Sequence, residues 1–186
     1  MRPDPALFAD AFADALRPHY DDAVRYCRAL CATWAPHEAE DVLQAALLRA
    51  YEGFGALRDR DRFRPWLFRT LTRTHATAAR RHTLRRLVPF PADAERELGL
   101  FAEPTEPELA LRAALARLGR KERAALLLYE VAGLSVEEVR EAQGDRTASA
   151  VKVRLHRARA RLRDMLAEPD VDGAPPEPRP SALPLT

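Results

Sequence analysis

The chain has little glycine, few aromatic residues and almost no cysteine. Its 186 residues include seven glycines, two cysteines and only 7% aromatic side chains. Scarce glycine in a chain rich in alanine, leucine, arginine and glutamate favours an all-α fold. Two cysteines cannot build a disulfide framework, and they fit a reducing, cytoplasmic environment. The composition therefore excludes a small disulfide-stapled domain and favours a helical protein of the cytoplasm.

Long apolar runs and targeting signals are also absent from the sequence. No run approaches the roughly 18 apolar residues that a membrane-spanning helix needs. The first 16 residues carry Asp4, Asp10 and Asp14 and lack the basic segment with which a secretory signal begins. We therefore expect no membrane insertion. The length predicts one ordinary domain or two small ones.

Motifs of enzymes and metal sites are poorly represented. The sequence contains no P-loop, no nucleophile elbow and no H-E-x-x-H motif. Cys27 and Cys31 lie one helical turn apart near two histidines, so a zinc or redox site is one hypothesis. The alternative is that both are small buried side chains on a core stripe. We expect no catalytic residue, no cofactor and no metal.

Charge is arranged in blocks, although the net charge is only +2. Residues 58–86 hold ten arginines and two acids, and residues 146–163 hold one lysine, six arginines and no acid. Between them, residues 87–108 hold six acids and one arginine. Two basic stretches on either side of an acidic one predict two contacts with a polyanion. The alternative is that these stretches are solvated helix faces.

Apolar spacing and helix signals predict three helices in the first half, over about 19–34, 37–54 and 65–87. Side chains of the first recur every three or four residues, as one helical stripe requires. Pro36 separates the first two helices, and Pro65 suits the first turn of the third.

Four further helices are predicted in the second half, over about 105–118, 120–132, 135–143 and 147–167. Thr105 with Glu108, and Ser135 with Glu138, are capping boxes that open two of them. The predicted fold is all-α, with two small helical domains and a helix-turn-helix at the end of the second. Its expected divisions are domain 1–88, linker 89–104, domain 105–168 and a disordered proline-rich tail, 169–186.

The helix-turn-helix pattern covers residues 135–166, where a short capped helix, a tight turn and a longer basic helix follow one another. The second helix of such a motif enters the major groove of DNA, and its first residues reach base edges. The alternative is a plain basic helix in a bundle. The candidate DNA contacts are Thr147, Ser149, Lys152 and Arg154 for bases, with His156 and Arg157 for phosphates.

The first basic stretch interleaves its arginines with Phe63, Trp66 and Phe68. Cations that follow a backbone and rings that take unstacked bases suit single-stranded nucleic acid. The alternative is that the rings are core anchors. At least one must be, because residues i and i+2 of a helix point apart.

Two parts of the sequence resemble extracytoplasmic-function (ECF) sigma factors of bacterial RNA polymerase. The segments AEDVLQAALLRAYEGF (39–54), RFRPWLFRTL (62–71) and AARR (78–81) resemble the family's second region. The segments at 111–142 and AVKVRLHRARARLRDML (150–166) resemble its fourth region. The resemblance implies an initiation factor without catalysis of its own. It also implies contacts with core polymerase through the β′ clamp helices and β flap, with promoter DNA, and with an anti-sigma factor.

The candidate site residues combine those of the matching family motifs with those of the two basic patterns described above. Those for core polymerase are Glu40, Asp41, Gln44 and Arg49. Those for the −10 element are Arg62, Phe63, Arg64, Trp66, Arg69, Arg73, Arg80 and Arg81. Those for the −35 element are Thr147, Ser149, Lys152, Arg154, His156 and Arg157, and Trp66 has a core anchor as its alternative role.

The chain departs from the family pattern in two places. Residues 72–77 replace a usual R-N-L-A-x-D stretch and gain an arginine while losing an acid. In the helix-turn-helix, Arg140 and Gln143 replace small or apolar residues, and the turn at 144–146 is one residue longer. The −10 preference and the geometry of the turn are therefore not fixed by the resemblance. A second hypothesis is a helix-turn-helix regulator that uses residues 1–90 for dimerisation or sensing.

Overall fold

The described part of the protein consists of helices joined by turns. The computed structural model describes residues 5–87 and 105–167, and these ranges contain no strand, which confirms the all-α fold. Short 3-10 turns occupy Arg17–His19 and Arg60–Arg62. The predicted linker and tail lie outside the described residues. The helices are α1 (Pro5–Leu16), α2 (Tyr20–Leu30), α3 (Pro36–Phe54), α4 (Phe63–Leu87), α5 (Glu106–Arg117), α6 (Arg120–Glu130), α7 (Val136–Gln143) and α8 (Ala148–Leu166).

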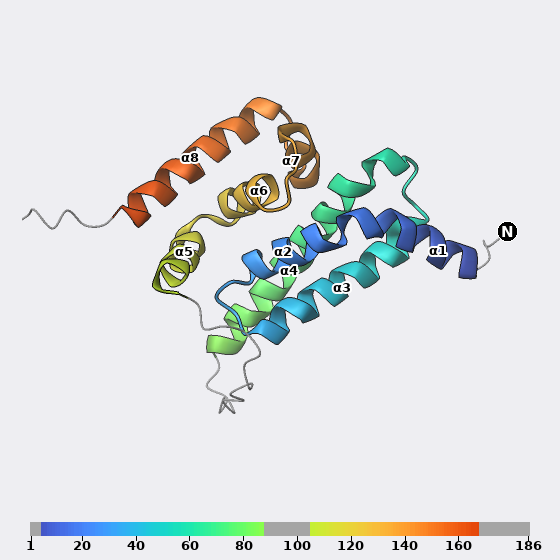
Figure 1. Ribbon diagram of the computed structural model, residues 1–186, viewed down its shortest axis with the longest axis horizontal. Helices are drawn as coiled ribbons and strands as arrows, with labels where there is room; N and C mark the ends of the chain where they lie inside the picture. The colour runs from blue at the N-terminus through green and yellow to red at the C-terminus, as the bar shows by residue number, and fades with distance from the viewer. Residues whose placement is uncertain (1–4, 88–104, 168–186) are drawn as a thin grey trace, which may run out of the picture.

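Helix α4 is the centre of the molecule. Helices α2 and α3 pack on one side of it and α7 packs on another, so α4 is covered from two directions (Figure 1). Leu67, Phe68 and Leu71 are fully buried. Burial of each such side chain contributes about 1.5–3 kcal/mol. Because two sides are covered, the apolar residues of α4 do not form the single stripe of a surface helix.

Helix α1 was not predicted, and an aromatic cluster holds it to the rest of the chain. Phe8 and Phe12 of α1 meet Tyr51 and Phe54 of α3 edge to face, with ring centroids 5.2–5.7 Å apart. Phe63 joins the cluster from the first residue of α4, with its ring centroid 5.6 Å from that of Phe54. Such pairs add about 0.5–1.5 kcal/mol each beyond the area that they bury.

Helix α2 is shorter than predicted. It ends at Leu30, and the next four residues form a turn instead of continuing to residue 34. Trp34, in this turn, stacks on two histidines of α4: its ring centroid lies 5.0 Å from that of His75 and 4.6 Å from that of His82. This long-range stacking anchors the turn against α4.

Local signals define the ends of the last two helices. The hydroxyl of Ser135 accepts the N–H of Glu138 at 3.2 Å, and the Glu138 carboxylate accepts the N–H of Ser135 at 2.8 Å, as the capping box predicts. Gly144 ends α7 with a φ of 67°, a left-handed conformation that glycine adopts without steric cost. Thr147 rather than Ser149 caps α8, because its hydroxyl accepts the N–H of Ala150 at 3.2 Å.

Helix α6 is the centre of the C-terminal half. Its residues 124–128 are all buried, and α7 and α8 pack on it. The C-terminal half also packs on the N-terminal half, with α7 against α4 and α6 against α2 (Figure 1). Helix α8 lies on the far side of α6, away from α4 (Figure 1). The two predicted DNA-contacting helices, α4 and α8, are therefore in different surroundings.

Candidate nucleic-acid interface

Helix α3 presents one exposed face that holds all four predicted polymerase contacts. Its exposed positions alternate in steps of three and one, which keeps them on one side of a helix. They are His37, Glu40, Asp41, Gln44, Ala45, Leu48, Arg49 and Glu52. Leu48 is 59% exposed in the middle of this face. The sequence analysis missed it, although its neighbour Leu47 already filled the inward position.

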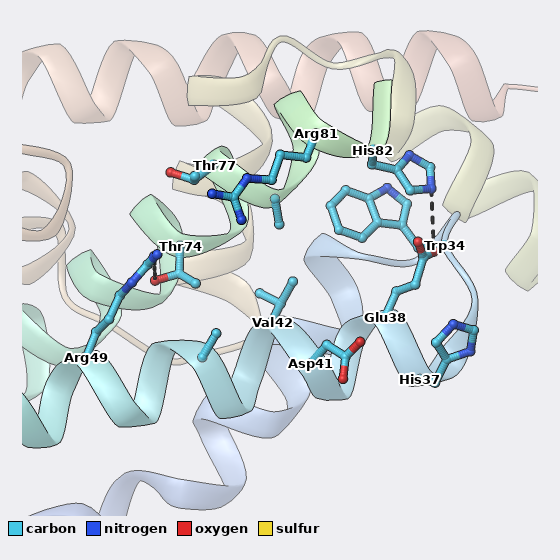
Figure 2. Close-up of a pocket in the computed structure, with 12 residues that line it drawn as sticks. Trp34, His37, Glu38, Asp41, Val42, Arg49, Thr74, Thr77, Arg81 and His82 are labelled. Carbon is cyan, nitrogen blue, oxygen red and sulfur yellow. Dashed lines mark hydrogen bonds and ion pairs between the residues drawn. The ribbon is translucent and has the colours of Figure 1, made fainter. Parts of the chain in front are cut away.

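Two hollows flank this face of α3. One, of about 210 Å³, is lined by Glu40 and Gln44 together with apolar side chains of α2 and α3. The other, of about 290 Å³, lies between α3 and α4 and is lined by Asp41 and Arg49 (Figure 2). Arg49 donates to the hydroxyl of Thr74 at 3.1 Å, so its guanidinium is held against α4. The predicted polymerase contacts thus divide between two recesses on either side of one ridge.

The hollow between α3 and α4 has an aromatic end. There the stacked pair of Trp34 and His82 lies beside Glu38, with His82 Nε2 3.4 Å from the carboxylate (Figure 2). Arg81 also lines this hollow. One of the two arginines predicted to close the −10 segment therefore faces the α3 side of α4.

The aromatic side chains of the −10 segment divide between core and surface. Phe63 is 4% exposed within the aromatic cluster, and Phe68 is fully buried beside Tyr26, so neither ring offers a face at the surface. Trp66 is only partly buried. A Cβ atom added at Gly53 would lie 3.1 Å from the Trp66 ring, so that ring covers the α3 backbone closely. Trp66, which was predicted as a −10 contact with a core anchor as its alternative role, is the least buried of these three rings.

Arg64 joins the two halves of the molecule. Its guanidinium donates to the carbonyl oxygens of Ala132 at 2.7 Å and Gly133 at 3.2 Å. It also pairs with the carboxylate of Glu138 at 3.3 Å and that of Asp22 at 3.7 Å. Its side chain is only 25% exposed. A predicted −10 contact is therefore bound by the C-terminal half in this arrangement.

Arg64 also shifts the pKa values of two neighbouring side chains, Glu138 and His19. Burial alone raises the pKa of Glu138, but hydrogen bonds with Ser135 and Arg64 outweigh it and hold the pKa below its usual value. Burial, and then the nearby charge of Arg64, lower the pKa of His19. The charged form of Glu138 is thus favoured at neutral pH.

The other arginines of α4 and its preceding turn have varied surroundings. Arg62 is 63% exposed and pairs with Asp59 at 3.2 Å and with Glu141 of α7 at 3.6 Å. Arg69 is partly buried near Gly144. Arg73 is exposed beside a cavity between the two halves. Arg80 is exposed and donates to Thr77 at 3.4 Å.

Helix α8 presents an open face that contains most of the predicted −35 contacts. Ser149, Lys152, His156 and Arg157 are all exposed, and none has an ion-pair partner in the described ranges. Thr147 is exposed at the N-cap. Val153 lies on the same face and is 49% exposed, and it was not predicted because it carries no charge.

Arg154 does not belong to this open face. It forms a two-point ion pair with Asp145 and donates to Gln143, and its side chain is 17% exposed. Hydrogen bonds from Arg154 lower the pKa of Asp145. Gln143 and Asp145 lie where the chain departs from the family pattern, so the longer turn is held by the arginine that was predicted to contact DNA.

Cys27 and Cys31 are both buried, at 1% and 2% exposure. Burial raises the pKa of Cys27 well above its usual range and that of Cys31 to about 12. A metal ion or an oxidant reacts with the thiolate, so these surroundings favour the core role over the redox hypothesis. Within residues 5–87 and 105–167, no three potential ligands form a metal cluster, and no helix could cross a membrane.

Comparison with known families matches both halves of the chain. Residues 15–85 match the family described as sigma-70 region 2, and residues 108–162 match sigma-70, region 4. ECF RNA polymerase sigma factor SigE of Mycolicibacterium smegmatis is 32% identical over 178 residues, covering 88% of this chain and 67% of that one. The RNA polymerase sigma-E factor of Streptomyces coelicolor is 31% identical over 161 residues, covering 87% and 89%.

The chain is shorter than some of its relatives. It spans 51% of the ECF RNA polymerase sigma factor SigG of Mycobacterium tuberculosis, to which it is 30% identical over 196 residues and 86% of its own length. Among solved structures, CnrH in complex with the cytosolic domain of CnrY has a TM-score of 0.64 at 23% identity, covering 85% of this chain and 88% of that one. RpoE in complex with the anti-sigma factor NepR from Bartonella quintana has 0.66 at 21%, covering 84% and 96%. These two show a shared fold.

Proposed function

Because the chain belongs to the ECF sigma factors of RNA polymerase, we propose that it directs core polymerase to particular promoters and helps to open the −10 region. It works in the cytoplasm, and the polymerase carries out the chemistry while the factor binds. The observation that carries this proposal is the order of the two sigma-70 regions on two packed helical halves, one with the exposed α3 face and one with the open α8 face.

Core polymerase binds the exposed face of α3. Glu40, Asp41 and Gln44 supply polar contacts on it, and Leu48 supplies an apolar contact at the centre. Covering this leucine removes its apolar surface from water, while the polar groups around it pair with the partner. The clamp helices of the β′ subunit cover this face, and the C-terminal half contacts the β flap.

The open face of α8 reads the −35 element. Ser149, Lys152 and Val153 are placed to meet base edges, with Val153 suited to the methyl group of thymine. His156 and Arg157, one turn later, contact phosphates. Arg154 holds the turn and contacts the duplex only if its pair with Asp145 breaks.

The arginines of α4 and its preceding turn follow the −10 strand once the two halves separate. Arg62 and Arg64 leave their partners on α7 and the α6–α7 turn, and Arg69, Arg73, Arg80 and Arg81 continue along the same helix. Trp66 supplies a ring for an unstacked base, whereas Phe63 keeps its role in the core. An anti-sigma partner would act by preventing this separation, which extends to this chain what the two solved relatives are described as binding.

Run-off transcription tests the proposed function. Core polymerase and this protein alone are incubated with a promoter library, and selected transcripts are expected only when the protein is present. A helix-turn-helix regulator of the second hypothesis would bind DNA and yield no transcript without another sigma factor. That result would refute the proposal.

The α3 face is tested with two leucine variants. Leu48→Ala should weaken binding to core polymerase by about 1–2 kcal/mol, or roughly fivefold to thirtyfold, because less apolar surface is removed from water at the interface. Leu7→Ala is the matched control, because Leu7 is 68% exposed on α1, outside this face. Titration of labelled protein with core polymerase measures both, and equal affinities would place the interface elsewhere.

A further inference from the structure

A cavity of about 390 Å³ lies where α4 meets α6 and α7. Side chains of both halves line it, so it exists only while the halves are packed together. Its apolar surface comes from Leu30, Ala76, Ala124 and Ala142. The volume falls within the range of small-molecule sites, of about 300–1,000 Å³.

The remaining lining is strongly cationic. Arg73 of α4 and Arg120, Lys121 and Arg123 of α6 line the cavity, and no aspartate or glutamate is among the lining residues. None of these four cations forms an ion pair within the described ranges. By contrast, Arg64, on the same helix as Arg73, meets two carboxylates. The cavity therefore concentrates positive charge that is only partly compensated, by the carbonyl oxygen of Ala76, which accepts from Arg120 at 3.2 Å, and by the charge of Asp145 near Lys121.

Two buried nitrogen atoms at this cavity also lack partners in the described part of the chain. They are Nε of Arg123 and Nε2 of His75, whose side chain is only 4% exposed. Burial lowers the pKa of Arg123, and the nearby Arg120 lowers it further. The pKa of His75 falls to about 4 through burial and the charges of Arg123 and Arg120. Arg123 is partly buried without a carboxylate partner, a cost that a bound anion reduces, whereas Arg73, Arg120 and Lys121 are exposed.

We propose that this cavity binds a small molecule with two or more phosphate groups. Its phosphate oxygens lie against the cations of the two walls, because guanidinium and ammonium groups bind phosphate through charge-assisted hydrogen bonds. Its organic part lies on the apolar surface of the four lining leucine and alanine residues. A ligand with this chemistry bridges α4 and α6 and holds the two halves together.

The bridge has a consequence that rests on the proposed function. In the packed arrangement, Arg62 and Arg64 are bound to the C-terminal half. A ligand that favours this arrangement therefore competes with engagement of the −10 element. Binding of the ligand can be measured without polymerase or promoter. A failure of the ligand site can therefore be distinguished from a failure of the proposed function.

Calorimetric titration of the full chain tests the site directly. Pyrophosphate and ATP are the probes, with adenosine as the control that lacks phosphate. We expect one saturable site for the phosphate probes and none for adenosine. Absence of saturable phosphate binding, or several weak sites that vanish together in moderate salt, would overturn the proposal, because the latter is non-specific screening.

Variants from each wall locate the binding. Arg73→Gln on α4 and Lys121→Gln on α6 are both exposed positions and should each weaken ATP binding about tenfold. Arg112→Gln and Arg117→Gln on α5 remove the same charge at exposed positions outside the cavity and should leave the affinity unchanged. Equal losses in both pairs, or a loss confined to one wall, would refute a site that bridges the halves.

Energy transfer between the halves tests the bridging role. Dyes are placed through Glu52→Cys and Asp164→Cys, since both native cysteines are buried. ATP at a concentration near its Kd for the parent chain should raise the packed fraction in the parent chain and raise it far less in Lys121→Gln. ATP that binds with no change in transfer efficiency would show that the ligand does not hold the halves together. Duplex DNA that displaces the ATP while the transfer efficiency stays at its packed value would show that DNA backbone phosphates occupy the cavity instead.

Discussion

Helices α4 and α8 are both long and basic, yet they differ in what surrounds them. Helix α4 lies between α2 and α3 on one side and α7 on another, and Arg64 at its start is bound by backbone carbonyls and two carboxylates. Helix α8 packs one stripe on α5–α7 and leaves Lys152, His156 and Arg157 exposed. The same kind of sequence thus gives one covered and one open basic surface, and the packing of the two halves decides which.

The difference has a functional meaning for a factor that must contact two promoter elements. In the packed arrangement the α8 face that we propose for the −35 element is exposed, whereas Arg64 at the start of α4 is occupied. On this proposal, binding to promoter and polymerase supplies the free energy that separates α7 from α4. The contacts between α7 and α4, here called the seam, then set how readily the factor engages the −10 element.

The largest effect should come from reversing the charge of Arg64. Arg64→Glu places a carboxylate against Glu138 and Asp22 and removes the donors to Ala132 and Gly133. We expect the packed arrangement to lose about 2–5 kcal/mol, as for the loss of one partner from a desolvated charged contact. Energy transfer between dyes at positions 52 and 164 measures the separation.

The control for this variant is Arg58→Glu, at an exposed position of the loop before α4. It makes the same charge change without touching the seam. If both variants keep the transfer efficiency of the parent chain, Arg64 does not hold the halves together. The contacts of Arg64 would then not explain why α4 is covered and α8 is open.

The buried histidine of α4 should make the stability of the protein depend on pH, an effect expected of the covered helix α4 and not of the open face of α8. His75 is 4% exposed and its pKa is lowered to about 4, whereas the unfolded chain binds the proton near 6.5. The unfolded state therefore takes up more protons below pH 6.5, and stability falls as the pH drops from 6.5 towards 4. Between pH 7.5 and pH 5 the loss should be about 2 kcal/mol.

Urea unfolding of the parent chain and of His75→Phe at several pH values measures this loss. Phenylalanine keeps a ring to stack on Trp34 and cannot bind a proton. The variant should lose the part of the pH slope that lies between pH 6.5 and pH 4. An identical slope in both chains would assign the pH dependence to other groups.

A third prediction concerns the turn that precedes α8. The pair of Arg154 and Asp145 is mostly shielded, with side chains 17% and 10% exposed. Its loss should cost about 1–2 kcal/mol, between the values for exposed and fully buried pairs. Arg154→Ala and Asp145→Ala should therefore be strongly non-additive in a double-mutant cycle of thermal unfolding.

Measurements of DNA binding distinguish residues of α8 that contact DNA from Arg154, which holds the turn before it. Lys152→Ala should leave stability unchanged and weaken binding of duplex DNA containing the −35 element, because Lys152 is exposed on the open face. Asp145→Ala frees Arg154 and should reduce the stability of the turn without the same loss of DNA affinity. Additive effects on unfolding would mean that Arg154 and Asp145 act independently and that Arg154 is free for DNA.

Local chemistry made much of this structure predictable from the sequence. The Ser135–Glu138 capping box and the turn at Gly144 occur as predicted, and Thr147 caps α8, a role that the sequence left open between Thr147 and Ser149. The stripe of α8 was predictable because one side of that helix is covered. Helix α1 carries a weaker signal, and its position depends on aromatic partners from α3 and α4.

The surroundings of the site residues depend on long-range contacts that no local pattern encodes. Arg64 meets partners about 70 residues away, as its hydrogen bonds to Ala132 and Glu138 show. Burial of Phe63, with Trp66 less buried, follows from where α1 and α3 meet α4. The role of Arg154 depends on Asp145, whose significance appears only when the turn is folded. Candidate residues could therefore be found in the sequence, but which of them are buried or bound by distant parts of the chain could not.

The smallest effect should come from Arg62, which neighbours Arg64 but lies nearer to solvent. Arg62 is 63% exposed and its distance to Glu141 is 3.6 Å, so this cross-seam pair is worth at most about 0.5 kcal/mol. Arg62→Ala should therefore leave energy transfer between the halves almost unchanged and become indistinguishable from the parent chain in 0.5 M salt. If Arg62 follows the −10 strand, the same variant should still reduce permanganate reactivity of promoter thymines. If Arg62→Ala separates the two halves as much as Arg64→Glu does, packing of the halves depends on the summed charge of this segment and not on the enclosed contacts of Arg64.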